Sequence, residues 1–516
     1  MKDIVHLRSA QGLVVALSLA NLCFLTVWRE LLFAEPADSY WLPEYTATSY
    51  AAAIVNVLVL TLLLWAVPAR LAGSSTPWLA TLGRLLLLAV LLIPLNYLRL
   101  VLGVAENAII WIVDHWPITL PVAAAVALSA FYAMVVHLRA LTQAVAVGCV
   151  ILAPFAVSNL AQAAWTAARL TSATPGEAAP PDRKAPAGPR IVWLIMDELD
   201  LRLAFLQRPA GVVLPEFDRL RGQAFFALNA HSHSKNTKQA IPSFLTQKVV
   251  ALAEPRGAAA LHLTFEDFEN APDEDLDDTR HYFAEAAAAG ARIGLVGYYH
   301  PYCRLFWRHL ASCTGFAMNT YAPESGHSLA AEALSQLVGI TPFSRRFNAI
   351  HTYKAAEKEI LRLVANNAVD IVYVHAPVPH GPNIWDAKTD GFTIFNTTKD
   401  GYFDNLVLAD RLLGRIRGAM ERADLWDRSV VLLTSDHEWR HSYLYDNRRI
   451  PKIPFLLKMP GQETALEFSA EFSPMRVTKD LLLRLQSQQL TTPEEVAYWI
   501  GHSQPRPSKP VLVRAR

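Results

Sequence analysis

Long apolar runs dominate the first third of the chain. Up to about residue 168, several consecutive runs are nearly uncharged, and each approaches the roughly 20 residues that a helix needs to cross a bilayer. These runs cover about residues 11–33, 48–68, 80–102, 118–137 and 141–164. Buried helices of a soluble core explain so many uncharged runs less well. The pattern therefore predicts an α-helical membrane domain with five transmembrane helices over residues 1–168.

The pattern changes after about residue 190. Apolar runs of six or seven residues now alternate with amphipathic helical segments. The candidate strands are 191–196, 292–297, 370–375, 429–434 and 453–458, and the candidate helices are 279–290, 354–366 and 403–421. Continuous apolarity is typical of strands buried on both faces, as in parallel sheets. Residues 191–516 are thus expected to form an α/β domain with a mostly parallel sheet, joined to the membrane domain by a Pro/Ala-rich linker over residues 169–190.

The charged residues in the loops predict how the membrane domain is oriented in the bilayer. The chain has 47 Lys+Arg against 46 Asp+Glu, a net charge of +1, which excludes nucleic-acid binding driven by bulk basicity. The charged fraction of 18 % averages an uncharged membrane part with a normal soluble part. Basic residues mark one set of loops (Lys2, Arg8, Arg70, Arg139) and acidic residues the other (Glu35, Asp38, Glu44, Glu106, Asp114). The positive-inside rule then predicts an integral plasma (inner) membrane protein with a cytoplasmic N-terminus and an extracytoplasmic, periplasmic soluble domain.

Carboxylate and imidazole side chains follow three of the candidate strands. In chain order they are Asp197 and Glu198, then His375 and His380, then Asp436, His437 and His441. Sites in open α/β sheets form beyond the carboxyl ends of the strands. Each residue alone has an ordinary alternative, a turn or cap residue for Asp and a surface residue for His. Together they predict a divalent-metal site, and mixed oxygen and nitrogen ligands suit zinc, with manganese as the alternative.

A Ser/Thr-rich segment at 231–247 offers candidate nucleophiles. A bound metal can activate a hydroxyl without a neighbouring base. If a helix begins at Thr237, its hydroxyl also lies at a positive helix end that favours phosphate. The ordinary alternative is a helix N-cap.

A zinc-protease interpretation competes for the same residues. His437-Glu438-Trp439-Arg440-His441 matches H-E-x-x-H, which places two histidines on one helical face. The apolar run at 429–434 predicts a strand immediately before it, so the helix that the motif requires is not expected.

The motifs in this order resemble the sulfatase/alkaline phosphatase superfamily. They are strand–Asp–Glu, Thr-x4-Pro-x3-Thr, His-x4-His-Gly-Pro and strand–Ser-Asp-His. More narrowly, the chain resembles the membrane-anchored branch with phosphoethanolamine transferases and lipoteichoic acid synthases. That resemblance implies an alkaline-phosphatase-like three-layer sandwich and an extracytoplasmic catalytic domain.

The resemblance also implies residue roles. Asp197 and Glu198 match metal-binding carboxylates, Asp436 and His437 match the distal ligand pair, and Thr237 matches the nucleophile that also ligates the metal. His380 matches the histidine that contacts the transferred group, with His375 and Lys238 as further substrate-binding residues and His441 as a helper to the leaving group. Two departures are that Glu438 follows Asp-His where the family has Gly, and that Asp197-Glu198 is an acidic pair.

The implied activity is transfer of a phosphoethanolamine- or phosphoglycerol-type group. The donor would be a membrane lipid, and the acceptor a lipid-linked or glycan component of the cell envelope. Phosphatase, phosphodiesterase or sulfatase-like hydrolysis stays open, as does a non-catalytic scaffold. No Cys-x-Pro-x-Arg or Ser-x-Pro-x-Arg segment is present, which disfavours sulfate-ester hydrolysis. Cys303 and Cys313 are expected to form a disulfide if their domain lies in an oxidising compartment.

Overall fold

The computed structural model describes residues 5–7, 9–102, 116–170, 188–266, 274–276, 279–317, 328–341, 344–395 and 401–503. The chain divides into two compact units, and neither is continuous in sequence. The first comprises Met1–Glu35, Glu44–Pro175 and Ser325–Asn348, and the second Pro36–Pro43, Gly176–Glu324 and Ala349–Arg516. The expected linker at 169–190 lies largely outside the described residues.

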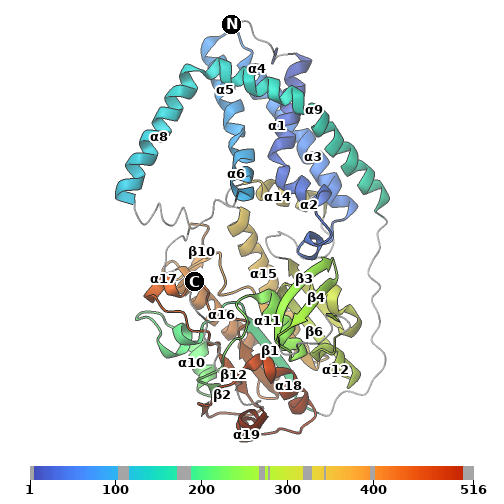
Figure 1. Ribbon diagram of the computed structural model, residues 1–516, viewed down its shortest axis with the longest axis vertical. Helices are drawn as coiled ribbons and strands as arrows, with labels where there is room; N and C mark the ends of the chain where they lie inside the picture. Colours follow the sequence, from blue (N-terminus) through green and yellow to red (C-terminus); the bar gives the residue numbers. More distant parts are fainter. Residues whose placement is uncertain are drawn as a thin grey trace. The chain divides into compact units, whose positions relative to one another are not determined.

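Helices make up the first unit (Figure 1). They are α1 (Ala10–Cys23), α2 (Leu25–Leu32), α3 (Ala47–Leu64), a π-helical turn (Trp65–Ala69), α4 (Arg70–Ala72), α5 (Pro77–Val90), α6 (Leu92–Val101), α8 (Trp116–Val136), α9 (Leu138–Arg169) and α14 (Leu329–Gly339). Three are long and apolar enough to cross a membrane: Ala47–Ala72, Pro77–Arg99 and Leu138–Arg169. The pair α1 and α2, bent by 67°, makes a fourth if it counts as one span.

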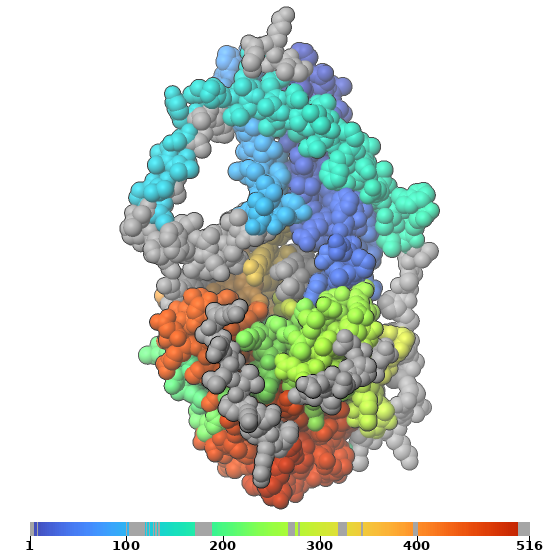
Figure 2. All heavy atoms as spheres, in the orientation of Figure 1, coloured from blue at the N-terminus to red at the C-terminus, as the bar shows by residue number. Residues whose placement is uncertain are grey.

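The five expected spans all fall on helical segments, but the described residues show three to four membrane-crossing candidates. The fourth expected span, 118–137, coincides with α8, several of whose side chains lie outside the described residues. Large apolar side chains such as Leu62 and Leu63, each 57 % exposed, lie on the surface of this unit; the part of the unit that precedes residue 170 is blue to teal in Figure 2. Such a surface is typical of helices that face lipid.

One helix of the first unit comes from the second half of the sequence. The short helix α14 packs on α3, and side-chain hydrogen bonds fix the contact. The Asn56 amide donates to the carbonyl of Ala333 at 3.0 Å and to Gln336 Oε1 at 3.2 Å, and the Gln336 amide donates to the carbonyl of Ser49 at 2.8 Å. A division into one membrane part and one soluble part along the sequence therefore does not describe this segment.

An eight-stranded sheet forms the centre of the second unit (Figure 1). Its order is β13 (Leu466–Phe468), β2 (Phe225–Ala227), β12 (Phe455–Lys458), β11 (Ser429–Thr434), β1 (Arg190–Met196), β8 (Ile371–Ala376), β6 (Ile293–Tyr299) and β7 (Ser312–Ala317). Strand β12 runs antiparallel to both neighbours, and the other pairings are parallel. The sheet is mostly parallel, as predicted.

Both faces of this sheet are buried. In β1, Ile191, Trp193 and Ile195 belong to one apolar cluster and Val192 and Leu194 to the other. The helices α10 (Pro215–Arg221), α15 (Ser344–Val364) and α16 (Gly401–Arg422) contribute to the second cluster. The first cluster takes side chains from α11 (Thr237–Thr246), α12 (Tyr282–Ala288), α13 (Tyr302–Phe306), α18 (Thr478–Gln486) and α19 (Pro493–Ser503). Burial on both faces explains the continuous apolarity of the strands.

Smaller elements complete the second unit. They are the three-stranded sheet β3 (Val250–Gly257), β4 (Ala260–Phe265) and β5 (Glu274–Asp275), the strands β9 (Trp385–Asp386) and β10 (Gly391–Phe392), the helix α17 (Tyr443–Asp446), the π-helical turn Arg202–Leu206, and the 3-10 turns Asp38–Tyr40, Trp307–His309 and Pro474–Arg476. The five predicted strands correspond to β1, β6, β8, β11 and β12, and the predicted helices to α12, α15 and α16. Helix α15 begins at Ser344, ten residues earlier than the sequence pattern indicates.

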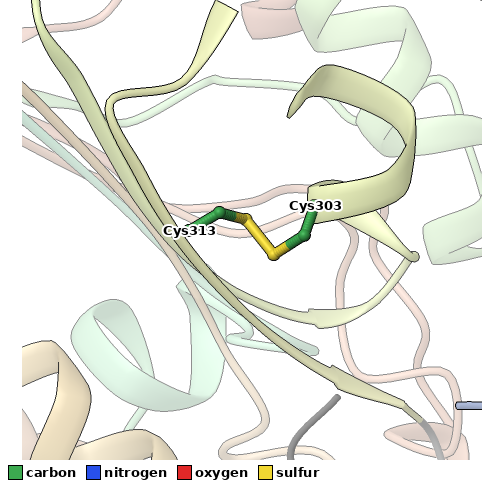
Figure 3. The surroundings of a disulfide bond; sticks show 2 residues. All are labelled: Cys303 and Cys313. Carbon is green, nitrogen blue, oxygen red and sulfur yellow. A yellow bond between two sulfur atoms is a disulfide. The ribbon is translucent and has the colours of Figure 1, made fainter. Parts of the chain in front are cut away.

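A disulfide joins Cys303, on α13, to Cys313, on β7 (Figure 3). The two Cα atoms are 5.6 Å apart, and the bond closes a loop with a sequence separation of 10. It ties α13 to the edge strand of the main sheet.

Candidate active site

Neighbouring parallel strands bring three predicted ligands together. Strands β1 and β11 pair with Ile195 opposite Thr434, so the residues that follow them emerge at the same edge of the sheet. Asp197, Asp436 and His437 each offer a ligand atom there, all within 4.8 Å of one another. All three side chains are fully buried. A shared edge of two adjacent strands is the reason that residues 239 positions apart meet.

The donor atoms of this cluster are available to a cation. Within the described part of the chain, neither carboxylate oxygen of Asp197 has a hydrogen-bond partner. Two unpartnered oxygens in a buried carboxylate are costly without a compensating charge. His437 Nδ1 lies 2.9 Å from the carbonyl of Glu438, which can only accept, so Nδ1 carries the proton and Nε2 keeps its lone pair. Two carboxylates and one imidazole fit a zinc or manganese ion.

The pKa shifts of the two clustered carboxylates also favour a bound cation. Burial, followed by the charges of Asp436 and Glu198, raises the pKa of Asp197 well above its usual range. Burial also acts to raise the pKa of Asp436, but His437, His375 and the Thr237 hydroxyl outweigh it and hold that pKa below its usual range. The surrounding side chains therefore stabilise the negative charge of Asp436 but not that of Asp197. A cation between them would stabilise both charges.

Thr237 lies directly against the cluster. It is the first residue of α11, and its hydroxyl donates to Asp436 Oδ2 at 2.7 Å while lying 3.5 Å from His437 Nε2. The N-cap of this helix is Asn236, whose side chain accepts from the Gln239 amide at 3.1 Å. Because Asn236 performs the capping, the capping explanation for Thr237 is wrong. The hydroxyl lies at the positive end of a ten-residue helix, where negative charge is stabilised.

Glu198 is not among the three clustered ligands. Its backbone has a φ of 63°, and its carboxylate accepts from Arg440 Nε at 2.6 Å. Burial acts to raise the pKa of Glu198, but His380, His437 and Arg440 more than compensate and lower it. The structure thus pairs Glu198 with a cation of the chain rather than adding it to the candidate metal ligands.

Arg440 is a site residue that the sequence motifs did not indicate. Its guanidinium contacts both Glu198 and His380 Nε2, the latter at 2.9 Å, and its side chain is 37 % exposed. It brings a partly exposed positive charge near Asp197 and Asp436, and a guanidinium in such a position can bind an anionic group. Its position inside H-E-W-R-H was the only signal in the sequence.

The remaining predicted residues have different surroundings. His380 is half-buried, its Nε2 is occupied by Arg440, and its backbone amide donates to the carbonyl of Asp197 at 3.0 Å. His375 is 1 % exposed on β8, the Tyr302 hydroxyl lies 2.8 Å from its Nδ1, and its Nε2 is buried with no hydrogen-bond partner among the described residues. His441 is exposed beside the ring of Tyr443 and is not among the residues brought together. Lys238 follows Thr237 on α11 and is half-buried.

The H-E-x-x-H segment does not form a helix. Strand β11 ends at Thr434, and α17 begins only at Tyr443. His437 is buried whereas His441 is exposed, and the carboxylate of Glu438 pairs with Arg449 at 2.7 Å. The geometry of a zinc protease is absent from this described stretch.

Comparisons with known proteins concern the fold. No family model matches the sequence, and no curated protein matches it. Among solved structures, a 4S-sulfatase from a glycosaminoglycan locus of Bacteroides thetaiotaomicron is 15 % identical, with a TM-score of 0.39, covering 63 % of this chain and 78 % of that one. The phosphonate monoester hydrolase of Agrobacterium radiobacter is 13 % identical, with a TM-score of 0.37, covering 58 % and 73 %.

A third solved structure is the lipoteichoic acid synthase LtaP from Listeria monocytogenes. It is 14 % identical, with a TM-score of 0.38, covering 58 % of this chain and 72 % of that one. At these values the comparisons assign no roles to individual residues. The solved structures similar to this chain include a sulfatase, a phosphonate monoester hydrolase and a lipoteichoic acid synthase.

Proposed function

We propose that this protein is a metal-dependent transferase of the cell envelope. It would move a phosphoethanolamine- or phosphoglycerol-type group from a membrane lipid to a lipid-linked or glycan acceptor. The observation that carries the proposal is the contact of the Thr237 hydroxyl with Asp436, at 2.7 Å, inside a buried cluster that fits a divalent cation. A hydroxyl at a positive helix end beside such a cluster suits nucleophilic attack on phosphorus.

The proposed reaction has two displacements. Asp197, Asp436 and His437 would hold the ion, with zinc favoured and manganese as the alternative. Bound there, it lowers the pKa of a nearby hydroxyl and offsets charge on phosphoryl oxygens. Thr237 Oγ1 forms a bond to phosphorus, its proton passes toward Asp436 Oδ2, and the bond from phosphorus to the lipid oxygen breaks, with water protonating the released alcohol. The acceptor hydroxyl oxygen then forms a bond to phosphorus and loses its proton to water, the bond from phosphorus to Thr237 Oγ1 breaks, and Oγ1 takes back the proton from Asp436 Oδ2.

Arg440 is assigned the binding of the anionic group in this proposal. Its guanidinium is oriented by Glu198 and His380. This moves the substrate-contacting role away from His380, whose ring would position Arg440 instead. His441 has no part in the proposed chemistry.

Location also enters the proposal. The disulfide between Cys303 and Cys313 fits an oxidising compartment, and the apolar helices of the first unit fit an integral membrane protein. We therefore propose a cytoplasmic N-terminus and an extracytoplasmic second unit. Anchoring would confine the enzyme to the surface that holds its lipid donor.

The test is a mass measurement on the full-length protein. Purified protein with Zn²⁺ or Mn²⁺ is mixed with vesicles containing phosphatidylethanolamine or, separately, phosphatidylglycerol. We expect release of diacylglycerol and a mass gain on Thr237 that matches the donor headgroup, both lost in Thr237→Ala. Release of diacylglycerol by Thr237→Ala at the wild-type rate, with no adduct on the wild type, would refute the proposal.

The closest competing function is hydrolysis by the same residues. It shares the first displacement and differs only in the second, where water replaces the acceptor. Product analysis separates the two: a transferase modifies an added glycan or lipid-linked acceptor, whereas a hydrolase releases the free headgroup phosphate at an unchanged rate when the acceptor is present.

A further inference from the structure

The segment Pro36–Pro43 joins α2 to α3 in sequence but belongs to the second unit. We call it the interspan segment. Its Tyr40 is 1 % exposed and lies in the apolar cluster beneath the main sheet. The guanidinium of Arg304 donates to three of its backbone carbonyls, those of Ser39 at 3.1 Å, Tyr40 at 3.0 Å and Leu42 at 2.9 Å. The segment is therefore held as an integral part of this unit.

A continuous hydrogen-bonded path leads from this segment to Thr237. The Tyr40 hydroxyl lies 2.7 Å from His300 Nδ1, and His300 Nε2 lies 3.2 Å from the backbone carbonyl of Thr237. A carbonyl can only accept, so Nε2 carries the proton and donates it. Nδ1 of the neutral ring is then an acceptor, and the Tyr40 hydroxyl must donate to it. Each donor and acceptor along the path is matched.

The residues around this path are tightly constrained. His300 is 2 % exposed and follows Tyr299, which ends β6 with a φ of 77°. A positive φ at a tyrosine is a strained conformation that persists only where its surroundings enforce it. The ring of Trp41, next to Tyr40, packs edge to face on Tyr299 with centroids 5.0 Å apart. The interspan segment thus contacts both Tyr299, through Trp41, and His300, through Tyr40.

We propose that the interspan segment is a positioning element of the active site, in which Tyr40 acts through His300 to hold Thr237. Donation from His300 fixes the first peptide of α11, and the orientation of that peptide sets where the Thr237 hydroxyl lies relative to Asp436. Tyr40 and His300 are positioning residues and do not contact substrate. This inference rests on the proposed role of Thr237 as nucleophile.

The test uses the full-length protein and a small phosphodiester, bis-p-nitrophenyl phosphate, as the probe. Tyr40→Phe keeps the ring and removes one hydroxyl. We expect kcat to fall about tenfold with KM within a factor of two, which corresponds to roughly 1.4 kcal/mol of lost alignment in the transition state. His300→Ala should show the same pattern with a larger loss. The double variant should be no slower than His300→Ala, because the hydroxyl acts only through the imidazole.

Two further variants isolate the effect. Tyr282→Phe is a matched control, because Tyr282 is fully buried in the same apolar cluster and its hydroxyl has no hydrogen-bond partner among the described residues. It should leave kcat unchanged. Arg304→Ala releases the three carbonyls of the interspan segment and should reproduce the loss seen in Tyr40→Phe.

A second measurement does not depend on turnover. Amide hydrogen exchange in the first turn of α11 should become faster in Tyr40→Phe than in Tyr282→Phe. Unchanged exchange there, wild-type kcat in Tyr40→Phe, or losses that multiply in the double variant would each overturn the positioning role. Thr237→Ala is measured alongside: if it retains wild-type activity, the proposed function itself fails, whereas an inactive Thr237→Ala with a fully active Tyr40→Phe refutes only the positioning role.

Discussion

Replacing Asp197 by Asn should stabilise the metal-free protein and remove most of the stabilisation that a metal gives to the wild type. Asp197 and Asp436 are fully buried, and their ligand atoms lie within 4.8 Å. At that separation and an effective dielectric constant of about 20, two unit charges repel by about 3.5 kcal/mol. Protonation limits this cost: from the unperturbed pKa of 3.8, taking up a proton at pH 7 costs about 4.4 kcal/mol. The metal-free variant should therefore be more stable than the wild type by about 3 kcal/mol.

Metal should nearly cancel this difference in stability. A metal at 100 times its dissociation constant stabilises a protein by about 2.7 kcal/mol. Loss of a residue that merely supports a ligand costs about 10–100-fold in affinity, so loss of the ligand itself should cost at least about 100-fold. Asp197→Asn should then gain almost nothing from the same metal concentration.

The assay is unfolding of the detergent-solubilised full-length protein in EDTA and in Zn²⁺, repeated with Mn²⁺. Asp424→Asn is the control, because Asp424 is 93 % exposed and its ion-pair partner Arg428 is itself exposed, so its replacement should alter neither condition. The reasoning is refuted if Asp197→Asn is less stable than the wild type in EDTA, or if Zn²⁺ and Mn²⁺ stabilise it as much as they stabilise the wild type.

Three further predictions concern the scaffold. Replacing Cys303 and Cys313 together by Ser should lower the free energy of unfolding by about 3 kcal/mol, from the loop with a sequence separation of 10; equal stability of the oxidised wild type and the variant would contradict this. Burial raises the pKa of Asp410 to about 6 from 3.8, so the folded state binds the proton more tightly, and stability should fall by about 3 kcal/mol as the pH rises from about 4 to 6. Asp410→Asn should flatten that profile and be the more stable protein at pH 7. Asn56→Leu removes two hydrogen bonds to α14, costs about 1–2 kcal/mol, and should speed amide exchange in α14; unchanged exchange would refute this role.

The main sheet and the clustering of Asp197, Asp436 and His437 were predictable, because both follow from the pattern of strands buried on both faces. Strands buried on both faces are continuously apolar, so β1, β8 and β11 stand out in the sequence. Residues after neighbouring parallel strands share an edge, and this places Asp197 near Asp436 and His437 without further information. The neighbouring strands β2 and β13, at one end of the sheet, are only three residues long, and so short a run has no recognisable period.

The path from Tyr40 to Thr237 could not be predicted, because it depends on contacts across the chain rather than on local pattern. Tyr40 lies in a connection between two apolar helices, where an acidic, aromatic segment reads as an ordinary loop. Arg440 was missed for a related reason: its partner Glu198 is 242 positions away. Conversely, the spacing of His441 suggested proximity to the site, but the turn after Asp436 leaves its side chain exposed.

The discontinuous units have a consequence for biosynthesis. The interspan segment emerges from the ribosome 260 residues before its partner His300. At about 5–20 residues per second, the ribosome needs roughly 13–52 s to cover that distance. During this interval the partners of Tyr40 and Trp41 have not yet been synthesised. The same holds for α3, because Gln336 of α14 lies 280 residues beyond Asn56. Neither unit can complete its fold in order of synthesis, so the last steps of both must follow translation of the second half of the chain.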